Sequence, residues 1–470
     1  MDAVKKPRLA AAASFIGTAL EYYDYFLYGT AAALVFGPVF FPFENSAIGT
    51  LFAFSTFAVA YIVRPLGAIL IGHYGDRVGR RKLLIIGIVA MGACTFLVGC
   101  LPTYASIGIA APILLLVLRV LQGIAVGGEF GGATSLAIEH APAHRRALYT
   151  SWVDQGSATG GLLATLAFLG FSSLPKSEFM SWGWRIPFLL SAVVVVVGLL
   201  IRLKLPESPE FAQVQQSRSL ARVPILTVLS HQKAALARVI LVSAITVVVS
   251  VIQVFSLSYG VSSGIPQSTM LTINLISSAL TLITMPLFAY VADLIGRRPV
   301  LITGMVVATV TLFPYFGALS AASAGTALAW AIVSWSIGFA MCAGVNPVFF
   351  AEMFDTRVRY SGAGLAQQLG QVLPGFAPAI AAGILAGGGS ATTVVLFVAA
   401  CALVSVVTVA TSPETKDVPM EDLGGLRELA VVEVDGSAPD PGGSTGATPT
   451  VDAGTASVDL SPTGQDPGQT

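Results

Sequence analysis

The residues that could carry chemistry in this chain are ionisable side chains inside long apolar stretches. The first stretch, about 12–41, places polar side chains three and four residues apart, on one face of a helix: Ser14, Thr18, Glu21, Asp24, Tyr25 and Tyr28. Such a face can pass protons or hydrogen-bond a small polar solute. The other positions are mostly Ala, Phe, Leu and Gly, so the opposite face meets lipid or protein. For any single residue, the alternative is a structural ion pair between helices.

Two charged residues lie deep enough in their stretches to meet near the middle of a membrane. Arg119 lies about 20 residues, or ~30 Å, before the end of its stretch, and Asp24 lies about 16 residues, or ~24 Å, past Arg8. Such a pair can couple protons to transport, because protonation of Asp24 frees Arg119 for a substrate anion or another carboxylate. Glu21 and Glu129 are further candidate coupling acids, and Glu129 fits either a pairing partner or a cavity acid.

Arg64 is the second cation inside an apolar stretch, and Pro65 beside it predicts a kink. Arg64 is either a substrate-binding cation or the partner of Glu21 or Glu129 in a structural pair. The two deep arginines favour a carboxylate substrate, whereas the acids leave room for a cationic or zwitterionic one. With Arg64, the predicted substrate-binding residues are Tyr22, Tyr25, Tyr28, Trp152, Asp154, Gln155 and Gln368.

A charged hairpin occurs twice, as G-H-Y-G-D-R-V-G-R-R-K at 72–82 and A-D-L-I-G-R-R-P at 292–299. The repeated residues, 217 positions apart, are Asp76, Gly79, Arg80 and Arg81, then Asp293, Gly296, Arg297 and Arg298. An offset close to half the chain predicts a duplicated membrane unit, as in transporters built from parallel repeats. Each Asp can cap a neighbouring helix, and the arginines can reach carboxylates, for which Glu139 and Glu352 are the candidates. We interpret these residues as a gate that holds one conformation.

Other patterns that suggest reactive sites lack the context that their chemistry needs. The glycine-rich segment 122–132 has no preceding strand and no following G-K-[ST], so it predicts close helix packing rather than a nucleotide site. Glu139, His140 and His144 have a metal-like spacing, but Pro142 breaks that helix, so no metal site is expected. The sequence shows no nucleophile–base pair or phosphate loop, so we expect neither an enzyme nor a cofactor.

The elements that must position these residues are long apolar helices. Hydrophobic residues make up 55% of the chain, charged residues 11%, and the mean hydropathy is +0.80, which excludes an ordinary soluble protein. A spanning helix needs about 20 mostly apolar residues. Twelve segments qualify: 12–41, 48–72, 82–101, 107–139, 147–171, 185–205, 236–262, 269–292, 299–320, 325–352, 362–387 and 391–411. The Asn346-Pro347 pair is expected to break the tenth of them.

Basic residues gather before the first span and in alternate loops, while the opposite loops carry little beyond Lys176 and Arg185. Because basic residues stay on the cytoplasmic side, both termini are expected there. The predicted organisation is a six-helix bundle at 1–205, a cytoplasmic linker loop at 206–235, a second six-helix bundle at 236–415 and an acidic tail at 416–470. The chain from Ser412 onward carries a net charge of −9. From about Glu421 it becomes rich in Gly, Pro, Thr, Ser and Asp, which predicts a disordered cytoplasmic tail.

These features resemble the major facilitator superfamily, and within it the metabolite:proton symporters that carry shikimate, 2-oxoglutarate, citrate and proline/betaine. The hairpin at 72–82 is similar to the superfamily signature, and the resemblance covers about 10–415. Further similar segments are E-Y-Y-D-Y-F-L-Y-G-T-A-A-A at 21–33, V-R-P-L-G at 63–67, Q-G-I-A-V-G-G-E-F-G-G at 122–132, W-R-I-P-F at 184–188, L-P-E-S-P-E-F at 205–211 and T-R-V-R-Y-S-G at 356–362.

The resemblance implies an all-α membrane protein with twelve transmembrane helices in two six-helix halves, the major facilitator fold. It links Asp24 and Arg119 to proton coupling, and it links Asp76, Arg80, Arg81 and Glu139 to the gating network. Two features depart from the family: Asp154 is an extra acid in the fifth span, and the tail lacks the coiled-coil pattern of osmosensing members.

We therefore expect a proton-coupled importer of a small polar metabolite, an organic acid or a zwitterion, that works by alternating access in the bacterial cell membrane. A sugar porter is the alternative within transport, because P-E-S-P and P-E-T-K occur in that class too. A non-transporting membrane sensor is the alternative in another class, but midmembrane charges argue against it. The expected partners are the solute, protons and the lipid bilayer, without nucleic acid, and the chain is expected to work as a monomer.

Overall fold

The computed structural model describes the backbone over 5–43, 45–78, 80–127, 130–139, 141–204, 224–356, 358–420 and 422–424. Within these ranges, side chains are described except at 5–14, 71–78, 80–84, 130–133, 136, 201–204 and 224–227. The described residues are almost all helical and contain no strand. The predicted all-α class is therefore confirmed.

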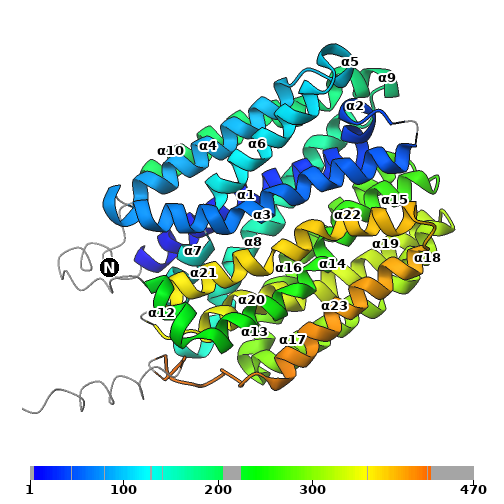
Figure 1. The fold of residues 1–470 in the computed structure, drawn as a ribbon. Coiled ribbons are helices and arrows are strands. Elements are labelled where there is room, and N and C mark those ends of the chain that lie inside the picture. The colour runs from blue at the N-terminus through cyan, green and yellow to red at the C-terminus, as the bar shows by residue number, and fades with distance from the viewer. Residues whose placement is uncertain are drawn as a thin grey trace, which may run out of the picture. The chain divides into compact units, whose positions relative to one another are not determined.

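The first six predicted spans are helical over nearly all of the residues that are described. They are α1 (Lys5–Ala31) with η1 (Ala32–Phe36) and α2 (Gly37–Phe40), α3 (Ser46–Val78), α4 (Arg80–Cys100), α6 (Ala110–Val126) with α7 (Phe130–Glu139), α8 (Arg146–Phe171) and α10 (Arg185–Lys204). Short helices join them: α5 (Tyr104–Ile107), η2 (Ala143–Arg145), α9 (Lys176–Glu178) and η3 (Phe179–Gly183). This half occupies the blue to teal part of the ribbon (Figure 1).

The last six predicted spans are helical as well, after α12 (Pro224–His231). They are α13 (Lys233–Ser243), η4 (Ala244–Thr246), α14 (Val247–Ser250), η5 (Val251–Phe255) and α15 (Ser256–Ser262) as one span, α16 (Gln267–Ile295), α17 (Arg297–Val310) with α18 (Leu312–Ser320), α19 (Ala324–Ala331) with η6 (Ile332–Phe339) and α20 (Ala340–Glu352), α21 (Arg359–Gly370) with α22 (Val372–Ala386), and α23 (Ala391–Thr411). Seven helices in the described ranges are each long and apolar enough to cross a membrane, or eight if the bent pair around Trp184 counts as one.

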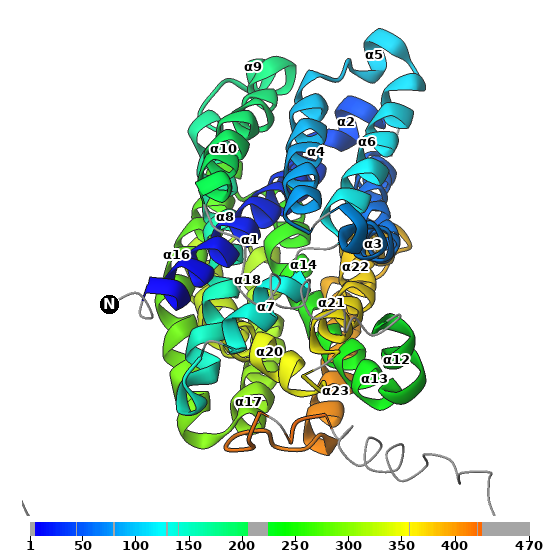
Figure 2. The same ribbon diagram turned by 90° about the vertical axis from the view of Figure 1, so that its left-hand side faces the viewer.

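The two halves meet along several helices. Two views show the helices of residues 5–204 beside those of residues 224–411 (Figures 1 and 2). Helix α8 packs against α16 and α20, and α3 packs against α22. All these residues belong to one compact unit that extends to Leu426.

The glycine-rich segment does pack as the sequence predicts. A Cβ on Gly123 of α6 would lie 2.5 Å from the Ala60 carbonyl oxygen of α3, so only glycine allows the two backbones to approach this closely. Close contact between α3 and α6 brings the helix that carries Arg119 against the helix that carries Arg64. The sequence thus fixes the relative position of two charged side chains through a residue that has none.

The expected break at Asn346-Pro347 is wrong. Helix α20 continues through Pro347, and the irregular part of this span is the π-helical turn η6, which precedes it. A proline inside a membrane helix is tolerated where neighbouring groups satisfy the carbonyl that it leaves free. Helices α3, α16 and α22 likewise continue through Pro65, Pro286 and Pro378.

Candidate functional site

Asp24 and Arg119, placed at similar depth by residue counting, do meet in the structure. Arg119 Nη1 lies 3.8 Å from Asp24 Oδ2, and both side chains are buried. The guanidinium of Arg119 also lies over the Tyr28 ring, 3.8 Å from its centroid. Helices α1 and α6 therefore present a carboxylate and a guanidinium to each other inside the bundle.

A relay of hydrogen bonds connects this pair through neighbouring helices. Arg119 Nη1 donates to Gln122 Oε1 at 2.5 Å, Gln122 Nε2 donates to Thr95 Oγ1 at 2.9 Å, and Thr95 Oγ1 donates to Asp24 Oδ1. Sequence reasoning missed Thr95 and Gln122. A signal existed for Gln122, because it follows Arg119 by one helical turn and so shares its face. The relay keeps the Asp24 carboxylate solvated by protein groups in place of water.

Arg64 and Glu21 form a second and tighter pair beside the first. Arg64 Nη1 donates to Glu21 Oε1 at 2.9 Å, and the guanidinium lies 4.3 Å from the centroid of the Tyr61 ring. Of the two partners predicted for Arg64, the structure shows Glu21, while Glu129 lies outside the described residues. Arg64 also lines a cavity, so its pair with Glu21 does not remove it from the cavity wall.

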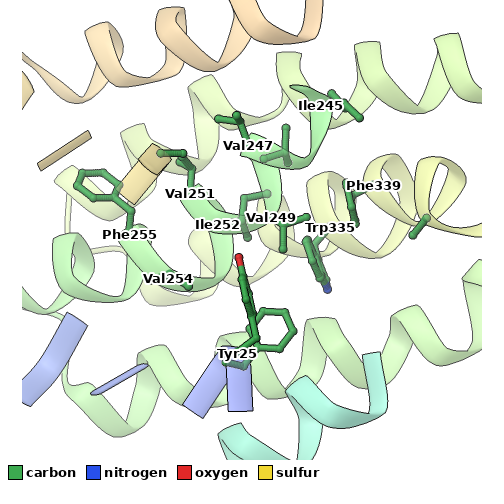
Figure 3. Packing of buried hydrophobic residues seen from close by; sticks show 14 of the residues in the cluster. Tyr25, Ile245, Val247, Val249, Val251, Ile252, Val254, Phe255, Trp335 and Phe339 are labelled. Carbon is green, nitrogen blue, oxygen red and sulfur yellow. The ribbon is translucent and has the colours of Figure 1, made fainter. Parts of the chain in front are cut away.

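The cavity, of about 60 Å³, lies between the two halves. Much of its polar and aromatic lining comes from α1, α3, α8, η6, α20, α21 and the residue that ends α21. These residues include Tyr22, Tyr25, Tyr61, Arg64, Asp154, Trp335, Phe339, Asn346, Gln367 and Gln371. Tyr25 and Trp335 lie beside each other here, close to Val249 and Phe339 (Figure 3). The Tyr25 hydroxyl is 2.9 Å from Ser250 Oγ, which links α1 of the first half to α14 of the second.

The structure brings some predicted substrate-binding residues to this cavity and not others. Tyr22, Tyr25, Arg64 and Asp154 line it. The remaining four lie elsewhere: Tyr28 is under Arg119, Trp152 is 50% exposed on the outer face of α8, Gln155 donates to the Leu282 carbonyl at 2.9 Å, and Gln368 is buried outside the lining.

Several lining residues were not among the predicted ones. Gln367 and Gln371 face the cavity from α21 and its end, in place of Gln368, and Tyr61, Trp335 and Asn346 join them. Polar residues in apolar helices are the signal that marks Asn346 and the glutamines. Composition alone does not say which of three neighbouring glutamines faces inward, because that depends on the rotation of α21.

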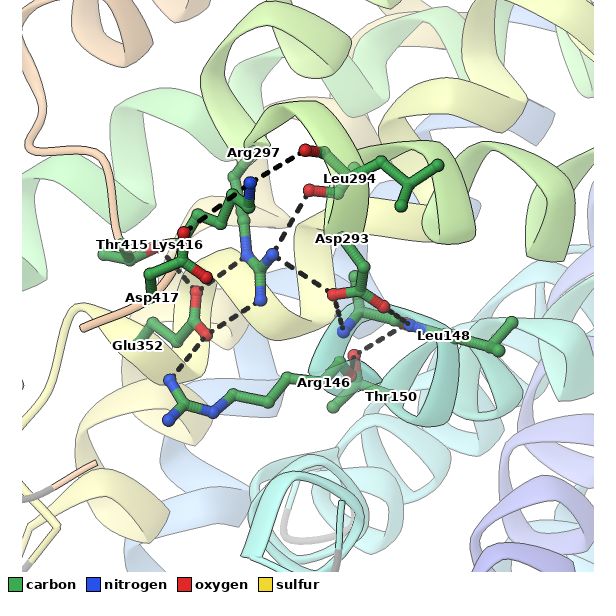
Figure 4. Close-up of polar contacts among 12 residues, drawn as sticks. Arg146, Leu148, Thr150, Asp293, Leu294, Arg297, Glu352, Thr415, Lys416 and Asp417 are labelled. Carbon is green, nitrogen blue, oxygen red and sulfur yellow. Dashed lines mark hydrogen bonds and ion pairs between the residues drawn. The ribbon is translucent and has the colours of Figure 1, made fainter. Parts of the chain in front are cut away.

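At one end of the bundle, a cluster of buried charges joins the two halves (Figure 4). Arg297 donates to both oxygens of Glu352, from Nε and Nη2, each at 3.2 Å, and lies 3.1 Å from Asp293. Arg146, from the first half, lies 3.5 Å from the same Glu352. We call Arg146, Asp293, Arg297 and Glu352 the Glu352 cluster.

Asp293 caps a helix of the other half, as the sequence predicts for an aspartate in this hairpin. Its two oxygens accept hydrogen bonds from the Ala147 and Leu148 backbone N–H groups, both at 3.0 Å, at the start of α8. A carboxylate there complements the positive end of the helix dipole. The start of α8, in the first six-helix half, is thus held to the second six-helix half by an Asp that belongs to α16.

The other predicted gating residues have different outcomes. Arg298 donates to the backbone carbonyls of Val409 and Ala410 rather than to a carboxylate. Glu139 is the last residue of α7, and its negative charge favours the charged form of the Arg359 guanidinium. The side chains of Asp76, Arg80 and Arg81 lie outside the described residues, so their gating role stays a prediction.

The chain after α23 does not leave the bundle at 416, where the tail was predicted to begin. Arg146 Nη1 donates to the Val418 carbonyl at 2.8 Å, and Gln232 Nε2 donates to the Gly424 carbonyl at 2.9 Å. Gly424 has φ +83°, and a Cβ there would lie 2.0 Å from the Asp355 nitrogen. The predicted boundary is therefore too early; the rest of the predicted tail, from 425, lies outside the described residues.

Glu414 anchors this segment to the start of α17. Its oxygens accept from the Arg297 and Arg298 backbone N–H groups at 2.9 and 3.0 Å. Partial burial alone would raise the pKa of Glu414, but four backbone N–H groups, those of Arg297, Arg298, Lys416 and Thr415, together lower that pKa below its ordinary value.

We expect Glu414→Ala to lower the stability of the protein by about 1 kcal/mol, as for loss of a helix cap. A carboxyl group with a lowered pKa stabilises the fold above the unfolded pKa, and this stabilisation is lost as the pH falls through the folded pKa. The difference in thermal midpoint between wild type and variant should therefore narrow from about pH 7 toward about pH 3. A difference that does not change over this range would contradict the ionic cap.

Comparison with known proteins gives a consistent result. The sugar (and other) transporter family model matches residues 9–231 and 224–425. The chain is 40% identical over 412 residues to the shikimate transporter of Escherichia coli K12, covering 86% of this chain and 94% of that one. It is 31% identical over 452 residues to the proline/betaine transporter of the same organism, covering 92% and 89%.

Solved structures agree at the level of the fold. The inward, partially occluded form of the xylose transporter XylE from E. coli matches with a TM-score of 0.70 at 19% identity, over 88% of this chain and all of that one. The proton:xylose symporter bound to a bromodeoxyglucose matches with a TM-score of 0.71 at 18% identity, over 90% and 99%.

Proposed function

This chain belongs to the sugar (and other) transporter family of the major facilitator superfamily, and from this premise we propose that it imports a small polar metabolite together with protons. It is a multi-pass membrane transporter and not an enzyme. Alternating access of one central site, first to one side of the membrane and then to the other, is the mechanism that two repeated halves around a midplane cavity favour.

The observation that carries proton coupling is the buried Asp24–Arg119 pair. A carboxylate 3.8 Å from a guanidinium holds it in place while ionised, and releases it when it accepts a proton. Arg119 then keeps the Gln122 side chain, the Phe57 carbonyl at 3.5 Å and the Tyr28 ring, none of which carries a charge, so it attracts an anion or another carboxylate. Proton binding and a change in the bundle are thereby linked through one side chain.

The observation that supports a carboxylate or zwitterionic solute is Arg64 in the cavity wall. The chains named as shikimate and proline/betaine transporters are similar in sequence to this one, and shikimate, proline and betaine each carry a carboxylate. A sugar is the alternative solute, because the cavity also presents Asn346, Gln367 and Gln371. Amide groups hydrogen-bond hydroxyls as readily as carboxylates.

We assign the Glu352 cluster to the gate. It connects both halves at one end of the bundle, so the halves cannot separate there while these contacts hold. The distribution of basic loops supports a cytoplasmic position for this end and for both termini. The arrangement described here is then closed toward the cytoplasm, and opening it requires Glu352 to lose Arg146.

Purified protein in proteoliposomes tests the function directly. Organic acids, zwitterions and sugars are offered one by one under an inward proton gradient, and accumulation is compared with that in vesicles at equal pH. We expect one of the acids or zwitterions to accumulate only under the gradient. Accumulation of sugars alone would indicate that the protein is a sugar porter. Uptake of no solute would favour the alternative of a non-transporting membrane sensor.

Arg64→Lys should weaken binding of that solute about tenfold. Lysine keeps the charge but loses the planar, two-pronged contact with a carboxylate. Arg185→Lys is the matched control, because Arg185 donates to the Gly99 and Leu101 carbonyls away from the cavity and should bind solute normally. Equal affinity in both variants would remove Arg64 from the solute site.

A further inference from the structure

The charges that face the cavity do not balance. Among the described residues of its lining, Arg64 is the one cation and Asp154 the one carboxylate. Arg64 is already paired with Glu21 at 2.9 Å. No hydrogen-bond donor or cation contacts the Asp154 carboxyl group within the part of the chain that the structure describes, so this group lacks a partner that would stabilise its ionised form.

Two further hydrogen-bond acceptors in the cavity wall lack a donor in the described structure. Asn346 Oδ1 and Gln367 Oε1 are buried, line the same cavity and have no hydrogen-bond partner among the described residues. A buried acceptor without a donor costs about 1–3 kcal/mol, and a lone carboxylate costs more. A solute that brings N–H groups to these three acceptor groups, the Asp154 carboxyl and the two amide oxygens, would recover that cost.

Donors without partners face the cavity as well. Trp335 Nε1 and Arg64 Nε are buried and unpaired in the described structure. They suit the carboxylate end of a solute, since both can donate to its oxygens. The cavity thus offers unpaired acceptors and unpaired donors to a solute that carries both kinds of group.

Aromatic rings complete the wall. Tyr22 and Tyr25, with ring centroids 5.6 Å apart, and Trp335 and Phe339, stacked at 4.8 Å, all line the cavity. The faces of such rings attract a cation, and Trp does so best. Aromatic surface therefore adds to the preference that Asp154 creates, and it also accepts the apolar body of a small ring or chain.

Resting on the proposed function, we infer that the solute is an amino-acid-like zwitterion whose protonated primary or secondary amine binds Asp154, with its carboxylate toward Arg64 and Trp335. An N–H-bearing amine satisfies the unpaired acceptors, which a quaternary ammonium does not. A hydroxy acid satisfies them without neutralising Asp154. The carboxylate of Asp154 therefore selects for a protonated amine. The three acceptor groups of the cavity select against a fully methylated amine, which has no N–H to donate.

Binding to the purified protein in nanodiscs tests this with shape-matched sets of probes. One set is L-proline, N,N-dimethylproline and cyclopentanecarboxylate; another is β-alanine, its trimethyl betaine and propionate; shikimate represents the hydroxy acids. In each set that binds, we expect methylation or removal of the amine to lower affinity at least about tenfold, the effect of losing charged hydrogen bonds.

Variants locate the effect at Asp154. Asp154→Asn should lose the amine preference, so that amine and amine-free probes bind within about threefold of each other, whereas Asp154→Glu should keep the preference even where folding is weakened. Glu178→Gln, which removes an exposed carboxylate outside the cavity, should behave as wild type. Melting temperatures of all four proteins report whether each is folded.

Three results would overturn the inference. They are an amine-free acid that binds wild type as tightly as any amine, no binding by any amine, and an amine preference that survives Asp154→Asn. Uptake of an amine-free acid driven by a proton gradient would leave the proposed symport intact but would contradict the inference that the solute carries an amine. Loss of gradient-driven uptake for every solute would instead remove the symport.

Discussion

Asp24→Asn should abolish accumulation driven by a pH gradient. For one proton carried with each solute molecule in an electroneutral cycle, a gradient of about one pH unit supports about tenfold accumulation in wild type, since one unit corresponds to about 1.4 kcal/mol. Asparagine keeps the size of the side chain and its contact with Thr95, but it cannot take up the proton. The expected accumulation ratio of the variant is about one.

Exchange of internal for external solute should persist in Asp24→Asn, because exchange needs no net proton movement. Arg119→Lys should disturb coupling as well, because lysine does not reproduce the fixed fork that contacts Gln122 and the Tyr28 ring. Radiolabelled uptake with and without the gradient, at equal protein content, measures both. Normal gradient-driven accumulation by Asp24→Asn would remove the coupling role of Asp24.

Glu352→Gln should open the gate end of the bundle. The Glu352 side chain is fully buried and contacts Arg297, Arg146 and Thr415, so its removal leaves two buried guanidinium groups poorly compensated. Breaking such a buried pair costs about 3–5 kcal/mol, which shifts a two-state equilibrium by a factor of about 10² to nearly 10⁴. We expect net uptake to fall at least about tenfold while solute binding survives.

Hydrogen exchange of the backbone reports that shift. Peptides from the start of α8, which Asp293 caps, should exchange faster in Glu352→Gln. Asp417→Asn is the control, because the Asp417 side chain is 78% exposed and its pair with Lys416 is worth at most about 1 kcal/mol. Loss of solute binding together with unchanged exchange at α8 would place Glu352 in the solute site rather than in the gate.

Hydrophobic length and charge counting were enough to predict the membrane helices, while the major facilitator fold followed from the family resemblance. Twelve apolar stretches became helices in the described structure because each must satisfy its own backbone in lipid. The meeting of Asp24 with Arg119 followed from depth alone, since a helix rises a fixed distance per residue. The cap by Asp293 followed from its place in a repeated hairpin.

The rotation of each helix was harder to predict. Trp152 and Gln155 flank Asp154 on α8, yet only Asp154 reaches the cavity, because neighbours one or two positions away point about 100° or more apart. Which face turns inward is decided by packing against α1, α16 and α20, which lie far away in the sequence. The same reason explains why Gln367 and Gln371, and not Gln368, line the cavity.

The contacts of the segment after Thr415 with the helix bundle were not predicted, for a different reason. The tail was predicted to begin at 416 and to be disordered, because from about Glu421 its composition offers little apolar surface. In the structure, donors on other elements hold its backbone instead, chiefly Arg146 at Val418 and Gln232 at Gly424. Contacts of a backbone carbonyl with a distant side chain leave no trace in local composition.

Proton movement during solute uptake tests the central claim most directly. Proteoliposomes at equal internal and external pH, with a pH-sensitive dye inside, receive the solute that the uptake panel identifies. Symport predicts that the interior acidifies as the solute enters wild-type vesicles, and that Asp24→Asn vesicles show no acidification. Solute entry into wild-type vesicles without any change in internal pH would contradict proton-coupled import.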